Sequence, residues 1–289
     1  MKLEISHVTR YRYPEPVENS VNEIRLTPRT NYRQSCYHHS LKIEPGTSLF
    51  SYEDFFGNRV YAFSVTGLHQ ELVIRTHSVV VTREEGNSPS NQPPLQDQLG
   101  VLRSEQTRNR YAEFLTSTDY VSIGPGMAEY AAELAGGYAA STVYERIEQL
   151  CEGIHSRFVY DPSATEVSTT VEETIKLKRG VCQDFAHLMI AACRSLGVPA
   201  RYVSGYHFVG DLQGGHADFQ QATHAWAEVF IPGIGWTGFD PTNNGKMNWR
   251  YVKLGHGRDY RDIVPVKGIY RGGPDQQLDV VVDVKRIAE

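Results

Sequence analysis

The stretch Gly180-Val-Cys182-Gln-Asp-Phe-Ala-His-Leu-Met-Ile-Ala-Ala-Cys-Arg-Ser-Leu-Gly197 is the one around which the rest of the chain can be arranged. Its apolar residues recur at helical spacing and predict a buried helix: Phe185, Leu188, Met189, Ala192 and Leu196. Gly197 followed by Pro199 predicts the end of that helix. Cys182 then lies in the first turn, where unpaired N–H groups and the helix dipole favour a thiolate. The stretch therefore predicts a cysteine prepared for nucleophilic attack.

Two downstream stretches contain candidate partners for this cysteine. The run 223–230 alternates like a strand and contains His224. A turn at Pro232-Gly-Ile-Gly235 follows, and a second strand-like run returns to Asp240. A cysteine, a histidine and an aspartate in this order suit a nucleophile, a base and a carboxylate that orients the base. Cys182, His224 and Asp240 are therefore the candidate catalytic residues.

The length of the turn decides whether His224 and Asp240 can meet. With a plain four-residue loop at 232–235, Asp240 would oppose Ala227 and lie on the face away from His224. A one-residue bulge or an odd loop would put Asp240 opposite Trp226, diagonal to His224 and on its face. The triad therefore predicts a register irregularity in this hairpin, and a regular ladder there would count against it.

The composition carries no signature of a nucleic-acid-binding or membrane protein. The chain has 289 residues, of which 40% are hydrophobic and 22% charged, with a formal net charge of −5. Its N-terminus lacks a signal-peptide pattern, and its longest apolar run, 188–193, is too short to span a bilayer. The cysteines form no close pair, which suits a reducing compartment: Cys36, Cys151, Cys182 and Cys193. We therefore expect a cytoplasmic protein without nucleic-acid or membrane partners.

Strand and turn signals divide the chain into two parts. Residues 1–85 are rich in Val, Ile, Tyr, Phe and Thr between Pro, Gly and Asn turns, and predict a β-rich, sandwich-like N-terminal domain. The polar, Pro- and Ser-rich segment 86–98 is the expected linker. Residues 99–289 are then the expected catalytic domain, ending in a strand over 277–287. Within it, residues 243–260 are expected to be irregular.

Helical signals dominate the beginning of the second part. A short helix is predicted over 127–134, and capping boxes at Thr142 and Thr170 predict two more helices. A strand is predicted over 200–206. The Gly-, Asp- and Gln-rich segment 210–221 is either a mobile loop that gates substrate entry or an ordinary hairpin excursion. His207 and His216 flank or lie in this loop and are candidates for substrate contact.

Four strings, taken in order, carry a family resemblance: Arg179-Gly-Val-Cys-Gln-Asp-Phe-Ala-His187, Leu196-Gly-Val-Pro-Ala-Arg-Tyr-Val-Ser-Gly-Tyr206, Thr223-His-Ala-Trp226 and Gly238-Phe-Asp-Pro-Thr242. Together they resemble the transglutaminase-like superfamily of cysteine enzymes. The similarity is closest to a bacterial branch with a β-rich N-terminal domain. It covers residues 100–265 well and residues 1–85 more loosely.

The resemblance implies an α+β, papain-like core in which a helix carrying the cysteine packs on an antiparallel sheet. It implies that Cys182 is the nucleophile, His224 the base and Asp240 the orienting residue. The reaction it implies is thiol-dependent acyl transfer to an amine, or hydrolysis, at an amide or peptide bond through a thioester acyl-enzyme. No acidic loop suggests the calcium sites of animal members, so no cofactor is expected.

Eukaryotic transglutaminases place a tryptophan upstream of the nucleophile to stabilise the oxyanion. The three tryptophans here are at 226, 236 and 249, all downstream, which favours protease- or amidase-like hydrolysis over protein crosslinking. Tyr160 is the candidate for the neighbourhood of the missing tryptophan, and Gln183 and Trp226 are further supporting candidates. Backbone N–H groups at the helix start are expected to bind the oxyanion.

Two alternatives belong to other classes of function. The chain could keep the fold as a catalytically silent binding or scaffold module, since each of the three residues alone is common in structural positions. A metal site made from Cys182, His187 and His224 lacks any short-spaced pair of ligands, so no metal is expected. Arg258 and Asp259, near the end of the resemblance, are expected to pair with each other rather than to support the site.

Overall fold

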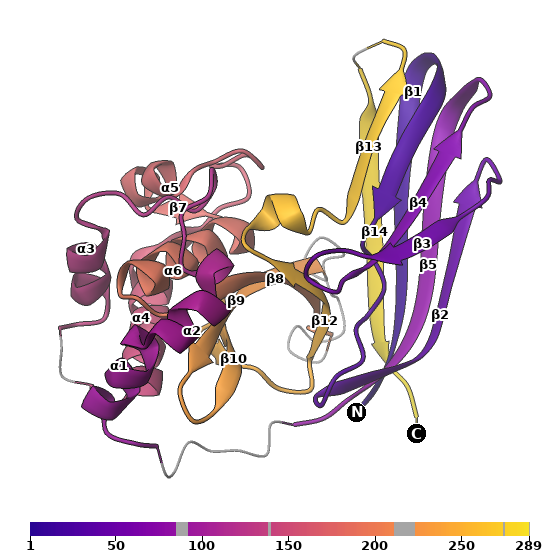
Figure 1. Cartoon of the computed structure of the whole chain (residues 1–289). Helices are drawn as coiled ribbons and strands as arrows, with labels where there is room; N and C mark the ends of the chain where they lie inside the picture. Colours follow the sequence, from indigo (N-terminus) through magenta and orange to yellow (C-terminus); the bar gives the residue numbers. More distant parts are fainter. Residues whose placement is uncertain (85–91, 138–139, 211–222, 274, 289) are drawn as a thin grey trace.

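The computed structural model describes residues 1–84, 92–137, 140–210, 223–273 and 275–288 (Figure 1). Its N-terminal part is a strand assembly made of β1 (Lys2–Ile24), β2 (Gln34–Glu44), β3 (Phe50–Glu53), β4 (Arg59–Val65), β5 (His69–Thr82), β13 (Val266–Arg271) and β14 (Gln277–Arg286). The long strand β1 belongs to two antiparallel arrays. Its first half lies between β5 and β14, and its second half lies between β4 and β13. β2 and β3 extend the two arrays at β5 and β4.

β1 continues through Pro14 and Pro16, which the sequence would place in a turn. The pairing with β5 shifts register between Arg12 and Val17, and residues 13–16 of β1 have no ladder partner among the described residues. Because residues 13–16 have no ladder partner in the described part of the chain, a proline among them removes no ladder hydrogen bond. Prolines are tolerated at such places, where a strand leaves its neighbours. The two prolines therefore mark the passage of one strand from the first array to the second.

The C-terminal strand differs from its expected place. The strand predicted over 277–287 exists as β14, but it pairs with β1 along ten residues, from Arg12 opposite Gln277 to Leu3 opposite Arg286. β13 pairs with the other half of β1. The chain thus returns to its N-terminal part, because β1 has an open edge beside each array. The two termini lie side by side (Figure 1), where the backbone N–H of Ile287 donates to the carbonyl of Lys2.

The other part contains α1 (Leu95–Arg103), α2 (Glu105–Arg110), α3 (Met127–Leu134), α4 (Val143–Arg157), α5 (Val171–Leu177), α6 (Cys182–Ser195), β6 (Val159–Tyr160), β7 (Arg179–Gly180), β8 (Ala200–His207), β9 (Thr223–Ile231), β10 (Gly235–Asp240), β11 (Gly245–Lys246) and β12 (Tyr251–Gly257). Five of these strands form an antiparallel sheet in the order β11-β10-β9-β8-β12. The predicted α+β core, with the cysteine-bearing helix packed on an antiparallel sheet, is confirmed. α1 begins within the segment expected to be a linker.

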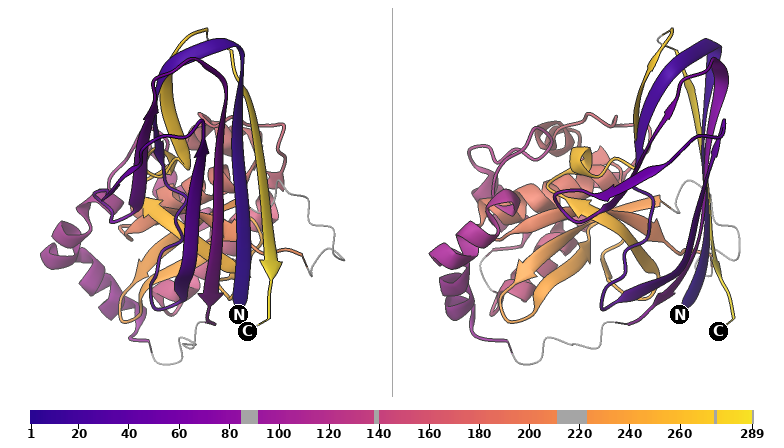
Figure 2. Two further views of the ribbon diagram at one scale, coloured as in Figure 1. Left: turned by 90° about the vertical axis from the view of Figure 1, so that its right-hand side faces the viewer. Right: turned by 45° about the vertical axis from the view of Figure 1, so that its right-hand side comes forward.

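The five-stranded sheet has a different neighbour on each face. Alternate residues of β9, including Ala225, Ala227 and Val229, join α6 and its surrounding helices in one apolar core. On the other side, Tyr206 of β8 and Leu254 of β12 join the core of the N-terminal strands. Figure 2 shows the N-terminal strands standing against this sheet, opposite the helices. The sheet is therefore the shared layer between the two parts of the molecule.

β12 lies in a segment expected to be irregular, so that prediction was wrong. All seven of its residues are buried although they include Lys253, His256 and two glycines. Lys253 is neutralised by an ion pair with Glu228. Gly255 is required by a close approach, since a Cβ there would lie 2.5 Å from Asn58 Oδ1 and from Ile263 Cδ1. The polar and glycine residues that resembled a loop are explained by contacts that come from distant segments.

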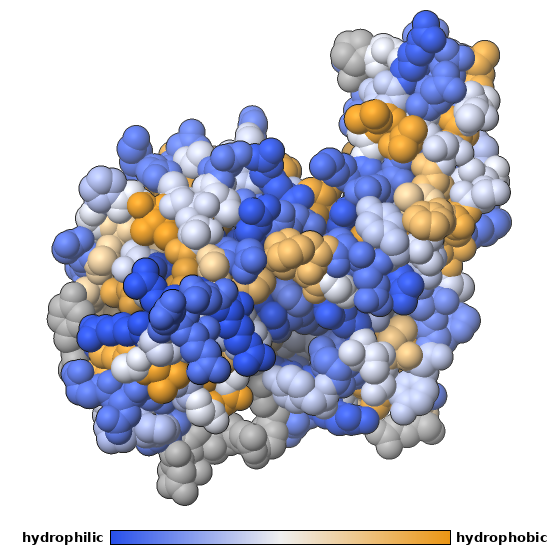
Figure 3. Space-filling model, in the orientation of Figure 1, coloured by the Kyte–Doolittle hydropathy of each residue, from blue (hydrophilic) through white to orange (hydrophobic). Residues whose placement is uncertain are grey.

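The surface seen in the orientation of Figure 1 is mostly hydrophilic, with apolar side chains in small separate groups (Figure 3). Among the described residues, no helix combines the length and apolar character needed to cross a membrane.

Candidate active site

The start of α6 presents Cys182 as its first residue, as predicted. Asp184 closes this helix start: its Oδ2 accepts the backbone N–H of Val181 at 2.8 Å and the hydroxyl of Thr165 at 2.7 Å. Burial raises the pKa of Asp184 above its usual value. Gly180 makes room for the carboxylate, since a Cβ there would lie 2.6 Å from Asp184 Oδ2. The loop before the cysteine is thereby fixed against its own helix.

The hairpin that carries His224 and Asp240 has the odd loop that the triad requires. Gly235 already pairs with Ile231, so the loop is the three residues 232–234, and the ladder runs without a bulge to Phe239 opposite Ala227. One step further along this ladder, Asp240 is opposite Trp226 and diagonal to His224. The ladder itself is regular, so the expectation that a regular ladder would count against the triad was wrong: the odd length of the loop alone brings Asp240 to the face of His224.

Asp240 is fully buried and collects hydrogen bonds on both oxygens. Its Oδ2 accepts from His224 Nε2 at 2.7 Å, from Asn243 Nδ2 at 2.7 Å and from the Tyr251 hydroxyl at 2.8 Å. Its Oδ1 accepts the backbone N–H of Thr242 at 2.9 Å. A carboxylate held this way has one orientation, and it fixes the His224 ring. Asn243 and Tyr251 were not identified from the sequence.

The second ring nitrogen of His224 remains for Cys182, whose thiol forms a hydrogen bond with the His224 side chain. Burial alone would lower the pKa of His224, but the charge and hydrogen bond of Asp240, together with Cys182, raise it to about 10. Burial alone would raise the pKa of Asp240, but His224 and the other donors hold it well below its usual range. The structure therefore brings all three predicted residues together, with a protonated imidazole between sulfur and carboxylate.

Two cavities adjoin this group, and both are lined by Thr223 and His224. The larger, about 340 Å³, contains Cys182 and extends between the start of α6 and the N-terminal strands β1 and β14. The smaller, about 170 Å³, lies beside Tyr160 and Asn243. Cys182 is half-buried and lines the larger cavity, which is the route by which a carbonyl can approach it.

Of the supporting candidates, Tyr160 and Gln183 lie at the site. Tyr160 pairs with Gly180 in the short parallel ladder of β6 and β7, and burial and the nearby Cys182 raise its pKa. Gln183 lines the larger cavity, and its amide donates to the carbonyl of Val167 at 2.8 Å.

Trp226 and His207 both lie beside the His224 ring. The Trp226 ring is buried and stacks near His224, with centroids 6.3 Å apart. His207 stacks on Tyr251 at 4.3 Å and lies 5.4 Å from His224. Burial, and the charge of His224, lower the pKa of His207 to about 4. His216 and most of the predicted gating loop lie outside the described residues.

Tyr202, on β8, is a residue that sequence reasoning missed. It lines the Cys182 cavity although its side chain is almost completely buried. Burial, followed by the charge of Cys182, raises its pKa well above the usual value. Among the described residues its hydroxyl has no hydrogen-bond partner. It is therefore a neutral O–H donor beside the sulfur. The string Ala200-Arg-Tyr-Val predicted a strand but not which residue would face the cavity.

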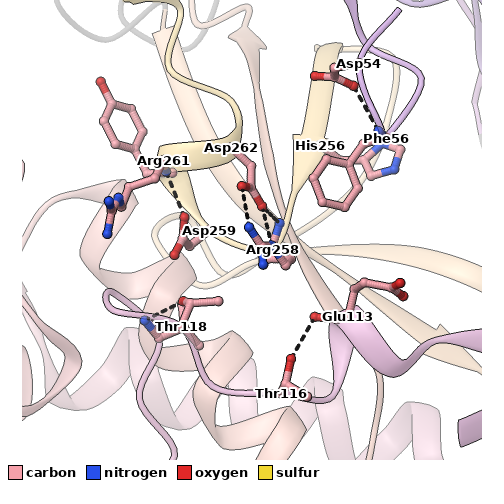
Figure 4. Close-up of polar contacts among 12 residues, drawn as sticks. Asp54, Phe56, Glu113, Thr116, Thr118, His256, Arg258, Asp259, Arg261 and Asp262 are labelled. Carbon is pink, nitrogen blue, oxygen red and sulfur yellow. Dashed lines mark hydrogen bonds and ion pairs between the residues drawn. The ribbon is translucent and has the colours of Figure 1, made fainter. Parts of the chain in front are cut away.

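The segment after β12 holds another tyrosine of the cavity, Tyr260. Figure 4 shows that Arg258 pairs with Asp262, at 2.8 and 2.9 Å, whereas Asp259 accepts the backbone N–H of Arg261. The expected Arg258–Asp259 pair is thus wrong, because Asp259 caps the turn 260–262 instead. The backbone N–H of Tyr260 donates to His187 Nε2 at 3.2 Å, so His187 helps to anchor this turn on α6.

The fold and the site define a cysteine-bearing α+β protein with a strand-rich N-terminal part. Residues 3–81 match the bacterial transglutaminase-like N-terminal region, and residues 128–241 match the transglutaminase-like superfamily core. An uncharacterized protein of Mycobacterium leprae is 35% identical over 288 residues, covering 99% of both chains. An uncharacterized protein of Mycobacterium tuberculosis is 35% identical over 291 residues, covering 98% of this chain and 92% of the relative. The chain belongs to the transglutaminase-like superfamily.

Two further likenesses are more limited. A Cytophaga hutchinsonii protein, provisionally described as a cysteine protease, shares the fold with a TM-score of 0.77 over 100% of this chain and 91% of its own, at 22% identity. A protein-glutamine gamma-glutamyltransferase of Pseudomonas aeruginosa is 33% identical over 98 residues, which are 30% of this chain and 14% of that protein. The first likeness shows the fold, and the second covers only a small part of each chain, so the particular reaction stays open.

Proposed function

We propose that the protein is a cysteine hydrolase that cleaves an amide or peptide bond through a thioester on Cys182. The observation that carries this proposal is the arrangement of three side chains. Asp240 Oδ2 accepts a hydrogen bond from His224 Nε2 at 2.7 Å. The His224 side chain also forms a hydrogen bond with Cys182, the first residue of α6. Hydrogen-bonded nucleophile, base and orienting carboxylate are what acyl transfer through a thiolate requires.

In the proposed reaction the Cys182 sulfur attacks the carbonyl carbon, and a C–S bond forms as the oxygen becomes an oxyanion. When the intermediate collapses, the C–N bond breaks and the proton held by His224 passes to the leaving amine. Water then attacks the thioester, giving its proton to His224 and releasing the acid and the thiolate. Asp240 stays ionised throughout and keeps the imidazole in place.

Two kinds of donor are available for the oxyanion. The first backbone N–H groups of α6 have no partner within the helix, and we expect them to donate to the oxyanion formed beside Cys182. Tyr202 adds a neutral hydroxyl that has no partner among the described residues, and Tyr160, beside the smaller cavity, adds a more exposed one. We expect Tyr202→Phe to lower kcat by roughly 10²-fold with little change in KM, as for the loss of one oxyanion donor. The same measurement on Tyr160→Phe shows which tyrosine acts; an unchanged kcat in both variants would leave the backbone as the donor.

Acyl-enzyme trapping tests the proposal directly. Incubation with p-nitrophenyl butyrate should give a burst of p-nitrophenol and a butyryl adduct on Cys182, seen by intact mass and removed by hydroxylamine. Cys182→Ala should show neither. Absence of burst and adduct in the unsubstituted protein would favour the alternative, a transglutaminase-like scaffold without turnover.

The acceptor can be identified separately. Hydrolysis is favoured here because the upstream tryptophan of crosslinking relatives has no counterpart in this chain. We therefore expect no incorporation of a fluorescent primary amine into casein above the level seen with Cys182→Ala. Incorporation that depends on Cys182 would show that an amine, rather than water, resolves the thioester.

A further inference from the structure

The N-terminal strands supply one wall of the cavity that contains Cys182. In the ladder between β1 and β14, three cross-strand pairs point to the same face: Tyr11 with Leu278, Thr9 with Val280 and His7 with Val282. Five of these six residues line the cavity, and Val282 belongs to the core of the N-terminal strands. The part of the molecule outside the cysteine-bearing core therefore forms a surface that faces the sulfur.

This wall is uncharged. Burial lowers the pKa of His7 to about 4, so its ring is neutral at neutral pH. The His7 ring is held between the Tyr206 hydroxyl at 2.8 Å and Thr9 Oγ1 at 3.0 Å. No Asp, Glu, Lys or Arg is among the described residues that line the cavity. A charged group that lies against this wall would lose water without meeting a counter-charge on the wall, which is costly.

The wall is also apolar at its open end. Leu278 and Val280 are 51% and 41% exposed, and both line the cavity. Pro265 and Val266, where the chain enters β13, line the cavity as well. Exposed aliphatic side chains beside a reactive sulfur offer surface that an apolar substrate group would cover.

We propose that Leu278 and Val280, with Tyr11, form an apolar subsite, and that the protein selects amides with an uncharged apolar group next to the reacting carbonyl. This inference rests on the proposed function for the reaction at Cys182. It assigns to the N-terminal part, and to the returning strand β14, the role of determining which substrates reach the sulfur.

The subsite can be tested without a known substrate by alkylating reagents that share one reactive group and differ only in the attached chain. We would compare second-order rates at Cys182 for iodoacetamide, N-hexyl iodoacetamide and N-(5-carboxypentyl) iodoacetamide, using the full chain and intact mass. The hexyl reagent should react roughly tenfold faster than the carboxylate reagent, because the terminal methyl group gains by burial on the apolar wall whereas the terminal carboxylate would have to lose water there. The double variant Leu278→Ser/Val280→Ser should lose that preference and keep its rate with iodoacetamide.

The same strand provides a matched control. Val281 lies between these positions but points to the opposite face and is 49% exposed. Val281→Ser should therefore keep the preference for the hexyl reagent. Equal rates for the hexyl and carboxylate reagents, or the same loss in Val281→Ser as in the double variant, would overturn the subsite while leaving a reactive Cys182. A Cys182 that none of the three reagents labels would overturn the proposed function and the subsite with it.

Discussion

The behaviour of the site is decided by Asp240, the residue at which its hydrogen bonds converge. The carboxylate is fully buried, yet three side chains and two backbone N–H groups donate to it. A buried charge is tolerated only when it is paired and hydrogen-bonded, as here. Its main effect on the chemistry is on His224, which it keeps protonated and oriented toward Cys182.

Replacing Asp240 by Asn should lower the pKa of His224, because it removes the charge that opposes burial. In the unsubstituted protein that pKa is about 10, so the NMR signals of the His224 ring should titrate well above pH 8. We expect kcat/KM to fall by roughly 10²- to 10⁴-fold in Asp240→Asn. An unchanged titration of His224 would contradict this assignment.

The raised pKa of His224 also makes the stability of the fold depend on pH. Since the folded pKa exceeds the usual 6.5, the stabilisation from the His224–Asp240 ion pair is complete below about pH 6.5 and is lost as the pH rises through the folded value.

At this scale the sequence was enough to predict which three side chains would lie together, but not which residues would hydrogen-bond to them. Cys182, His224 and Asp240 stand in short strings whose local pattern places each at a helix start or in a strand. Tyr251 and Tyr202 face the site because of how β12 and β8 are placed in the sheet. No short-range pattern distinguishes them from the other tyrosines of the chain.

Among the elements, β8 shows how tightly the sheet is packed beneath His224. At Gly205, a Cβ would lie 2.2 Å from the carbonyl of Val252 on β12 and 2.5 Å from the ring of Trp226 on β9. Trp226 in turn stacks against His224. The glycine therefore lets two strands and the indole approach one another, which sets the position of the histidine.

Gly205→Ala should destabilise the protein by about 1–3 kcal/mol through overpacking and should slow the reaction at Cys182 by displacing Trp226. Thermal unfolding followed by circular dichroism, together with the iodoacetamide rate, would measure both effects. Gly67→Ala is the control, since nothing lies within 4 Å of a Cβ at that position. Equal unfolding temperatures for the two variants would show that the close approach is not important.

The register of the β9–β10 hairpin could be predicted in part by counting the residues of its loop. The requirement that Asp240 reach the face of His224 demanded an odd loop or a bulge, and the loop has three residues. β12 could not be predicted this way, because the sequence Tyr251-Val-Lys-Leu-Gly-His-Gly257 contains polar and glycine residues that are unusual in a buried strand. Gly255 is explained by its close approach to Asn58, and Lys253 by its ion pair with Glu228. Local propensity favours a loop there, and contacts from distant segments override it.

Across the whole molecule, the returning strands join the two parts into one cooperative unit. The N-terminal core includes Tyr206 and Leu254 from the cysteine-bearing part and Val282 from β14. The Cys182 cavity likewise takes residues from both parts. A shared core of this kind predicts that the parts unfold together.

Val282→Ala should therefore lower the free energy of unfolding by about 2 kcal/mol, since it removes two buried methyl groups at a position that is 1% exposed. The effect should appear as one shifted transition, both in circular dichroism and in the protection of Cys182. Val281→Ala, on the exposed face of the same strand, should change stability by less than about 0.5 kcal/mol. Two separate transitions would contradict a single cooperative unit.

The class of fold could be predicted from the order of strand and helix signals, together with the resemblance. The place of β14 could not. Its alternating sequence predicts a strand, but an alternating strand fits any open edge of either sheet. Its pairing with β1 brings Leu278 and Val280 to the cavity, so the wall of the site was not predictable from local sequence.

The most direct test of the central claim is the site of alkylation by iodoacetamide at pH 6, read by mass spectrometry of the four cysteines. Burial raises the pKa of Cys36, Cys151 and Cys193, so these thiols should stay protonated and unreactive at that pH. We predict a single adduct on Cys182, lost in Cys182→Ala and strongly slowed in His224→Ala. Labelling of Cys36 as well as Cys182, or no reaction at Cys182 in the protein with His224 intact, would contradict the assignment of Cys182 as the activated nucleophile.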